Sequence, residues 1–213
     1  MKIKVCGMRE PSNIEALTTL APDYMGFICY EPSPRYIDEL PVAVTQAIPA
    51  AIQKTGVFVS ETAEVITELI TKYNFAAIQL HGNESPEFCA LFKDKVIVLK
   101  AFGVDEQFDF ELLKPYLNHV DFFLFDTKTD KHGGSGKTFD WRVLDKYTLN
   151  VPFFLSGGIS LDNLSEIAKI EHPQLYGVDL NSRFETAPGV KNIEDLRTAF
   201  KIIKELGTHE LRS

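Results

Sequence analysis

Eight short runs rich in β-branched and aromatic residues recur along the whole chain, and helix-like stretches separate them. The runs span residues 2–6, 24–29, 55–59, 76–80, 96–100, 122–126, 153–156 and 176–180. The stretch 62–73 predicts a helix, because apolar residues recur from Ile66 to Tyr73 at i, i+3, i+4 and i+7. The stretch 193–206 predicts another, with Asn192 as its N-cap and Gly207 as its end.

The composition of the runs indicates how they pair. FFLFD and VIVLK are apolar throughout, which is typical of parallel strands covered on both faces. Eight strand–helix units in 213 residues fit a closed α/β barrel, the (β/α)8 or TIM barrel, better than an open doubly wound sheet. Pro41 and Pro49 leave room for only about two turns in the second helix. With no linker or low-complexity tract, we expect residues 1–213 to form one domain.

Charge and cysteine content exclude several classes of protein. The chain has 22 basic and 30 acidic side chains, a net charge of -8, and no basic stripe for nucleic acid. No apolar stretch approaches the roughly 20 residues of a membrane-spanning helix, and the N-terminus has no signal-peptide pattern. Three cysteines without CxxC spacing and five scattered histidines favour a reducing cytoplasm, and predict neither a disulfide framework nor a metal site.

Polar and glycine-rich segments stand where the predicted strands end. Barrel closure brings these ends to one rim, where enzymes of this fold carry their active sites. The rim would collect Cys6, the segment SPRY at 33–36, His81, Asp126, the loop GGSGK at 133–137, the turn SGG at 156–158, Asp179, Asn181 and Ser182. A thiol and a carboxyl at one rim suggest a base and an acid.

Short motifs at these positions follow one another in a fixed order. They are KVCGMR, GFICYEPSPRY, GVFV, IQLHGNE, LKAF, FLFDTK with GGSGKTFDW, LSGGIS, and GVDLNS with PGVK. Together they resemble the phosphoribosylanthranilate isomerase family over nearly the whole chain. That family rearranges N-(5-phosphoribosyl)anthranilate into 1-(2-carboxyphenylamino)-1-deoxyribulose 5-phosphate in tryptophan biosynthesis. The resemblance therefore implies a cytoplasmic, cofactor-free isomerase of a small phosphosugar, present as a monomer or homodimer.

Such an Amadori rearrangement needs an acid that protonates the ring oxygen and a base that removes a proton from the adjacent sugar carbon. The resemblance assigns the acid to Asp126 and the base to Cys6. A thiol near the oriented amides of a strand end can be partly ionised, and a carboxyl walled by Phe122, Leu124 and Phe125 could hold its proton more firmly than one in water. The plainer alternatives are a buried apolar role for Cys6 and a loop cap for Asp126.

The phosphate and carboxylate of the substrate require two anion sites. The phosphate cradle is expected from two strand-end loops, at Gly157, Gly158, Asn181 and Ser182. Ser160 would cap the helix that follows, although SGG could be only a tight turn. Arg35 matches the arginine that anchors the carboxylate in the family, where an isolated surface arginine would be idle.

Several further positions carry weaker assignments. His81 and Asp179 are expected to contact the substrate, although either could be a structural polar group. The loop 127–137 is expected to fold over the substrate. After the eighth run the chain reads NSRFE where the family commonly has a serine-rich segment ending in glycine, so Asn181 and Arg183 depart from the pattern.

The sequence leaves two other functions open. A phosphosugar aldolase on this fold would use a Schiff-base lysine, and Lys100 ends the fifth run. A non-catalytic phosphate-binding barrel would keep the glycine and serine cradle without needing both Cys6 and Asp126.

Overall fold

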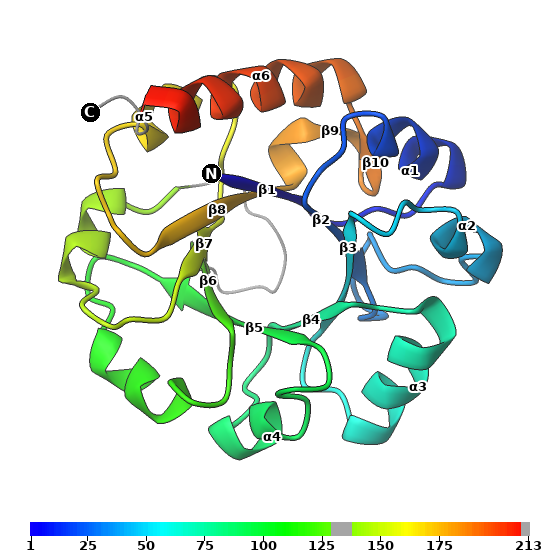
Figure 1. Cartoon of the computed structure of the whole chain (residues 1–213), viewed down its shortest axis with the longest axis horizontal. Helices are drawn as coiled ribbons and strands as arrows, with labels where there is room; N and C mark the ends of the chain where they lie inside the picture. The colour runs from blue at the N-terminus through cyan, green and yellow to red at the C-terminus, as the bar shows by residue number, and fades with distance from the viewer. Residues whose placement is uncertain (129–137, 210–213) are drawn as a thin grey trace.

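A computed structural model describes residues 1–128 and 138–209. Its first eight strands are β1 (Lys2–Val5), β2 (Tyr24–Ile28), β3 (Gln53–Phe58), β4 (Ala77–Leu80), β5 (Ile97–Val104), β6 (Phe122–Thr127), β7 (Phe153–Leu155) and β8 (Leu175–Leu180). Each strand pairs with the next in parallel, and β8 pairs with β1, so the sheet closes into a ring (Figure 1). The predicted (β/α)8 barrel is confirmed.

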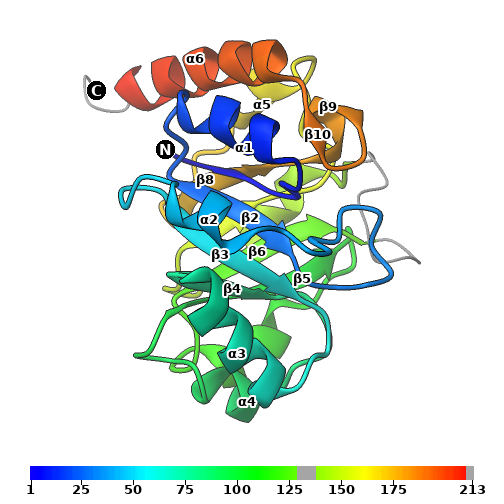
Figure 2. The same cartoon turned by 90° about the vertical axis from the view of Figure 1, so that its right-hand side faces the viewer.

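Helical segments surround this ring and cover its outer face (Figures 1 and 2). They are α1 (Pro11–Thr18), α2 (Val42–Gln46), α3 (Ala63–Tyr73), α4 (Pro86–Ala90), η1 (Phe110–Tyr116), η2 (Trp141–Lys146), α5 (Leu164–Ile167), η3 (Ser182–Phe184) and α6 (Ile193–His209). Thr62 caps α3 by accepting a hydrogen bond from the Val65 amide at 3.3 Å. Asn192 caps α6, as predicted, because its side-chain oxygen accepts from two amides of the first turn.

Three features differ from the prediction. The helix α6 continues through Gly207 to His209, because that glycine keeps a helical backbone. The strand β5 continues past Lys100, because it pairs with β6 as far as Val104. A two-stranded hairpin of β9 (Glu185–Ala187) and β10 (Val190–Lys191) also follows β8, where the sequence shows no run long enough to predict strands.

Two apolar layers lie on the two sides of the barrel wall. Alternate strand residues face the interior, and the interior cluster is Tyr24, Ala77, Leu99, Ala101, Leu124 and Phe154. The larger core lies between the strands and the outer helices. Apolar side chains fill the barrel interior. Inward-facing polar side chains therefore gather beyond them, at the carboxyl ends of the strands. Within the two described ranges, no helix is long and apolar enough to cross a membrane.

Candidate active site

A pocket opens where the barrel strands end. The nine residues that the sequence singles out all line it: Cys6, Arg35, His81, Asp126, Gly157, Gly158, Asp179, Asn181 and Ser182. Tyr30 and Gln79, which were not predicted at the rim, also line it, as do Ser33 and Ser156 of the predicted rim segments. The closed strand order therefore brings together residues from positions 6 to 182, as rim geometry predicts.

Cys6 follows β1 directly and is only 3% exposed. Gly26 of β2 leaves room for it, because a Cβ at that glycine would lie 2.8 Å from the Cys6 sulfur. Burial raises the pKa of the Cys6 thiol above its ordinary value, although the positive charges of Lys4 and Lys191 act in the opposite direction. Burial therefore opposes the partial ionisation that a strand-end thiol can have, and the two lysine charges favour it.

A buried ion pair lies beside this thiol. Lys4 Nζ donates to Asp179 Oδ2 at 3.0 Å, and the two side chains are 0% and 4% exposed. The other carboxylate oxygen, Oδ1, is buried without a hydrogen-bond partner in the described part of the chain. Asp179 therefore anchors Lys4 next to Cys6, and the Lys4 charge favours the thiolate form of that sulfur.

Asp126 stands near the end of β6, with 25% of its side chain exposed. Burial, followed by the nearby charge of Asp179, raises the pKa of this carboxyl to about 6. The direction of the shift agrees with the expectation, and two of the three expected wall residues, Phe122 and Leu124, lie on the same face of β6 as Asp126. Phe125 points away from the pocket and packs on Tyr147 in the outer layer, with 5.3 Å between ring centroids.

His81 lies between Asp126 and a residue that the sequence did not single out. Its Nε2 is 3.7 Å from Asp126 Oδ2, and Gln79 Nε2 is 2.6 Å from its Nδ1. The Gln79 amide therefore holds the His81 ring in place beside Asp126. Strand alternation could have indicated Gln79, since it shares a face with His81 two residues later.

The loop after β7 has the conformation that glycine allows. Gly157 and Gly158 have φ values of +88° and +64°, and a Cβ on Gly157 would lie 2.8 Å from Asp126 Oδ1. The expected cap at Ser160 is wrong, because α5 begins only at Leu164. Instead, the Asn163 side chain accepts from the Ser160 amide at 2.9 Å and donates to the Gly158 carbonyl at 3.0 Å.

The segment after β8 presents one amide and one hydroxyl to the pocket. Asn181 Oδ1 accepts from Lys191 Nζ at 2.7 Å. Because an ammonium only donates, the amide oxygen must face Lys191 and the amide nitrogen is left to donate elsewhere. Ser182 begins η3, and Arg183 is exposed and also lines the pocket. Of the expected covering loop, residues 129–137 lie outside the described residues.

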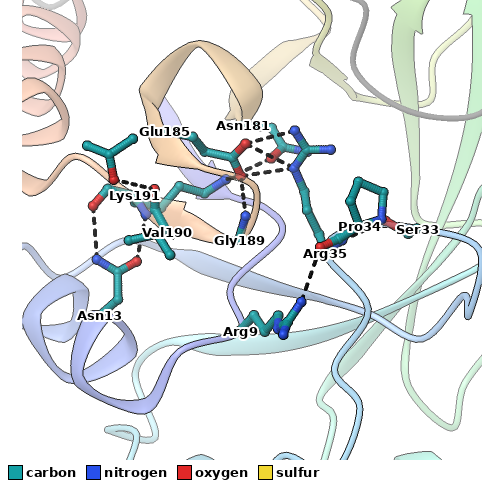
Figure 3. A network of polar contacts seen from close by, with 11 residues as sticks. Arg9, Asn13, Ser33, Pro34, Arg35, Asn181, Glu185, Gly189, Val190 and Lys191 are labelled. Atoms are coloured by element: carbon teal, nitrogen blue, oxygen red, sulfur yellow. Dashed lines mark hydrogen bonds and ion pairs between the residues drawn. The ribbon is translucent and has the colours of Figure 1, made fainter.

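Arg35 lies in the loop after β2 and is 8% exposed. Its Nε donates to both oxygens of Glu185, at 2.9 and 3.1 Å, and its Nη2 donates to Oε2 at 2.7 Å (Figure 3). Arg35 is therefore not an idle surface arginine. One edge of its guanidinium is held by Glu185, while Nη1 has no hydrogen-bond partner in the described ranges.

Lys100 does not fit the aldolase alternative. Leu99 and Ala101 belong to the interior cluster, so Lys100 points to the opposite side of the barrel wall. There its ammonium is 3.1 Å from Glu84 and donates to the carbonyls of Leu80, Gly82 and Ala101. A lysine held in the outer layer cannot form a Schiff base with a ligand in the pocket. Among the described residues, no group of His, Cys, Asp or Glu could hold a metal ion.

Comparison with known proteins gives one consistent family. Residues 3–202 match the family model of N-(5'-phosphoribosyl)anthranilate isomerase. A relative with this name from Parabacteroides distasonis is 46% identical over 200 residues, which cover 92% of this chain and 90% of the relative. The crystal structure of phosphoribosyl anthranilate isomerase from Thermus thermophilus superposes with a TM-score of 0.85 at 28% identity, covering 97% of this chain and 100% of its own.

A second solved relative carries a ligand. This phosphoribosyl anthranilate isomerase was crystallised in complex with reduced 1-(o-carboxyphenylamino)-1-deoxyribulose 5-phosphate. It superposes with a TM-score of 0.78 at 27% identity, covering 96% of this chain and 99% of its own.

Proposed function

The chain belongs to the N-(5'-phosphoribosyl)anthranilate isomerase family and is an isomerase of tryptophan biosynthesis; from this premise we propose that Cys6 is its general base and Asp126 its general acid. One observation carries the proposal: both side chains line the same pocket, and the pKa of Asp126 is raised to about 6. A carboxyl with that pKa keeps a protonated fraction near neutral pH, which a general acid requires.

The acid step opens the sugar ring. The Asp126 carboxyl gives its proton to the ring oxygen, the bond between that oxygen and the anomeric carbon breaks, and the nitrogen lone pair forms a protonated imine. The His81 ring, 3.7 Å from Asp126, is placed to stabilise the carboxylate that is left. As the enolamine becomes the ketone, the Asp126 carboxylate takes the proton of the enol hydroxyl, and the Cys6 thiol, protonated in the base step, gives its proton to the former imine carbon.

The base step removes the proton from the sugar carbon next to the imine. The electron pair of the broken C–H bond forms the carbon–carbon double bond of an enolamine, and the imine nitrogen becomes neutral. Only a thiolate can accept this proton, so Cys6 must first lose its own proton. The ammonium of Lys4, held by Asp179 beside the sulfur, supports that ionisation.

The remaining pocket residues bind the two ends of the substrate. Gly157, Gly158, Asn181 and Ser182 would hold the phosphate, with backbone amides of the left-handed glycine pair supplemented by side-chain donors. Arg35 would hold the anthranilate carboxylate through its free Nη1. His81 and Asp179 would contact the sugar at the centre. No cofactor is needed, since every proton transfer has a donor or acceptor among these residues.

A direct assay tests this proposal. The purified protein should convert freshly made N-(5'-phosphoribosyl)anthranilate, measured as the loss of anthranilate-type fluorescence, and inorganic phosphate should compete with the substrate. Borohydride should trap no covalent imine with the protein. A folded preparation that binds phosphate but converts no substrate would instead support the non-catalytic alternative.

A further inference from the structure

The Glu185 carboxylate binds both Arg35 and Lys191. Glu185 takes no part in the proton transfers described above. It lies on β9, and its side chain is 5% exposed. Its Oε1 accepts from Lys191 Nζ at 2.6 Å and from the Gly189 amide at 3.1 Å, in addition to the bonds from Arg35 (Figure 3). One buried carboxylate thus joins two cations.

Lys191 carries the connection onward. Its side chain is fully buried, and its ammonium also donates to Asn181 Oδ1 at 2.7 Å. The backbone of Lys191 is fixed by α1, because the Asn13 side chain donates to its carbonyl at 2.9 Å and accepts from its amide at 2.7 Å. We call Arg35, Glu185, Lys191 and Asn181 the Glu185 network.

Gly7 shows how tightly the network is packed. Its φ is +79°, and a Cβ there would lie 2.8 Å from Arg35 Cδ and 2.9 Å from Asn181 Oδ1. The Arg35 and Asn181 side chains therefore meet over one glycine. The Arg35 and Lys191 bonds also outweigh the effect of burial and lower the pKa of Glu185, so the carboxylate is ionised at neutral pH.

We propose that Glu185 is a positioning residue that fixes the donors for both anionic ends of the substrate. On one side it holds the Nε and Nη2 edge of Arg35, so that Nη1 faces the pocket for a carboxylate. On the other side it holds Lys191, which fixes the Asn181 amide with its nitrogen free for a phosphate. The inference rests on the proposed roles of Arg35 and Asn181.

The Glu185 network carries a net positive charge in a buried region, which favours an anionic ligand. Two cations face one carboxylate, which leaves an excess of one positive charge in a buried region. A buried unpaired charge is unfavourable, so an anionic ligand is attracted to this end of the pocket. The hairpin of β9 and β10 thus serves as the scaffold for substrate binding.

Glu185→Gln tests the inference. The amide keeps the size of the side chain, but it loses the negative charge and places an N–H donor against the donors of Arg35 or Lys191. We expect KM for N-(5'-phosphoribosyl)anthranilate to rise at least about tenfold, with kcat changed less than about threefold. Two probes separate the ends of the pocket: anthranilate for the carboxylate site and inorganic phosphate for the phosphate site. Inhibition by both probes should weaken at least about fivefold.

Two further variants make the outcome decisive. Arg35→Ala should weaken anthranilate inhibition alone; if it weakens neither probe, the proposed role of Arg35 fails, whatever Glu185 does. The control Glu84→Gln breaks a comparably buried ion pair, with Lys100 in the outer layer, and should lower the melting temperature without weakening either probe. If Arg35→Ala weakens anthranilate but Glu185→Gln leaves both probes within twofold, the positioning role is overturned.

A second substitution covers the case in which Glu185→Gln does not fold. Glu185→Asp keeps the negative charge but is one methylene shorter, so it cannot hold both cations at their present distances. We expect it to fold and to weaken at least one probe about fivefold. Unchanged inhibition by both probes would overturn the inference.

Discussion

Cys6 and Asp126 have opposite requirements for the same reaction. The acid must be protonated although its pKa is about 6, and the base must be ionised although burial raises the pKa of its thiol above the ordinary 9. The reactive form, with Asp126 protonated and Cys6 ionised, is then not the dominant one between the two pKa values. Its population is nevertheless constant between the two pKa values, because the gain in thiolate with pH offsets the loss of protonated Asp126.

This balance predicts the pH profile. kcat/KM should rise with pH up to about 6, stay level above that, and fall only above the pKa of the thiol. Below pH 6 Asp126 is already protonated, so activity follows the thiolate fraction alone. Above the thiol pKa, activity follows the falling fraction of protonated Asp126. The profile is measured from the loss of substrate fluorescence in well-buffered solutions of constant ionic strength.

Ser156→Ala provides the matched perturbation. The Ser156 hydroxyl stabilises the Asp126 carboxylate and lowers its pKa, so its removal should move the lower break of the profile to higher pH. The control Ser33→Ala changes another pocket hydroxyl, one that bonds the Arg35 amide, and should leave the break in place. A break that does not respond to Ser156→Ala would belong to a group other than Asp126.

At the scale of elements, neighbouring strands offer two glycines on opposite sides of the barrel wall. A Cβ at Gly26 of β2 would lie 2.8 Å from Cys6 Sγ and 3.1 Å from Cys6 Cα. A Cβ at Gly56 of β3 would lie 2.7 Å from the ring of Phe75 in the outer core. The same substitution should therefore disturb catalysis at one position and packing at the other.

We expect Gly26→Ala to lower kcat by roughly tenfold or more, because displacement of a proton acceptor by a fraction of an ångström weakens the transition state. Gly56→Ala should lower stability by about 1–3 kcal/mol through overpacking while keeping most of kcat. Turnover and thermal unfolding of both variants check this. Equal loss of kcat in the two variants would mean that Gly26 does not act through Cys6.

Much of the barrel follows from local pattern, and the exceptions have physical reasons. Continuous apolar runs located the eight strands, and strand ends together with the family motifs located the nine pocket residues. The aldolase alternative failed at Lys100 because this side chain alternates to the outer face, between Leu99 and Ala101 of the interior cluster. The roles of Glu185 and Lys191 were missed because they arise from tertiary contacts. Arg35 is 150 residues from Glu185 in the sequence, and Asn181 and Lys191 share no helix or strand whose period would relate them.

At the scale of the whole molecule, we propose that residues 1–213 form one domain, because barrel closure requires the first and last strands to pair. Thermal or denaturant unfolding should then be a single transition. Trp141, the only tryptophan, lies at the start of η2 and reports on the second half of the barrel, while far-ultraviolet circular dichroism reports on all of it. Separate transitions for the two signals would indicate more than one folding unit.

The central claim is the pairing of a cysteine base with an aspartic acid in one pocket, and the turnover of two variants tests it most directly. Cys6→Ala and Asp126→Asn should each lower kcat for N-(5'-phosphoribosyl)anthranilate by at least about a hundredfold, the usual effect of losing a positioned base or acid. KM and the melting temperature should change far less. A folded variant of either kind that keeps most of its turnover would contradict the role assigned to that residue.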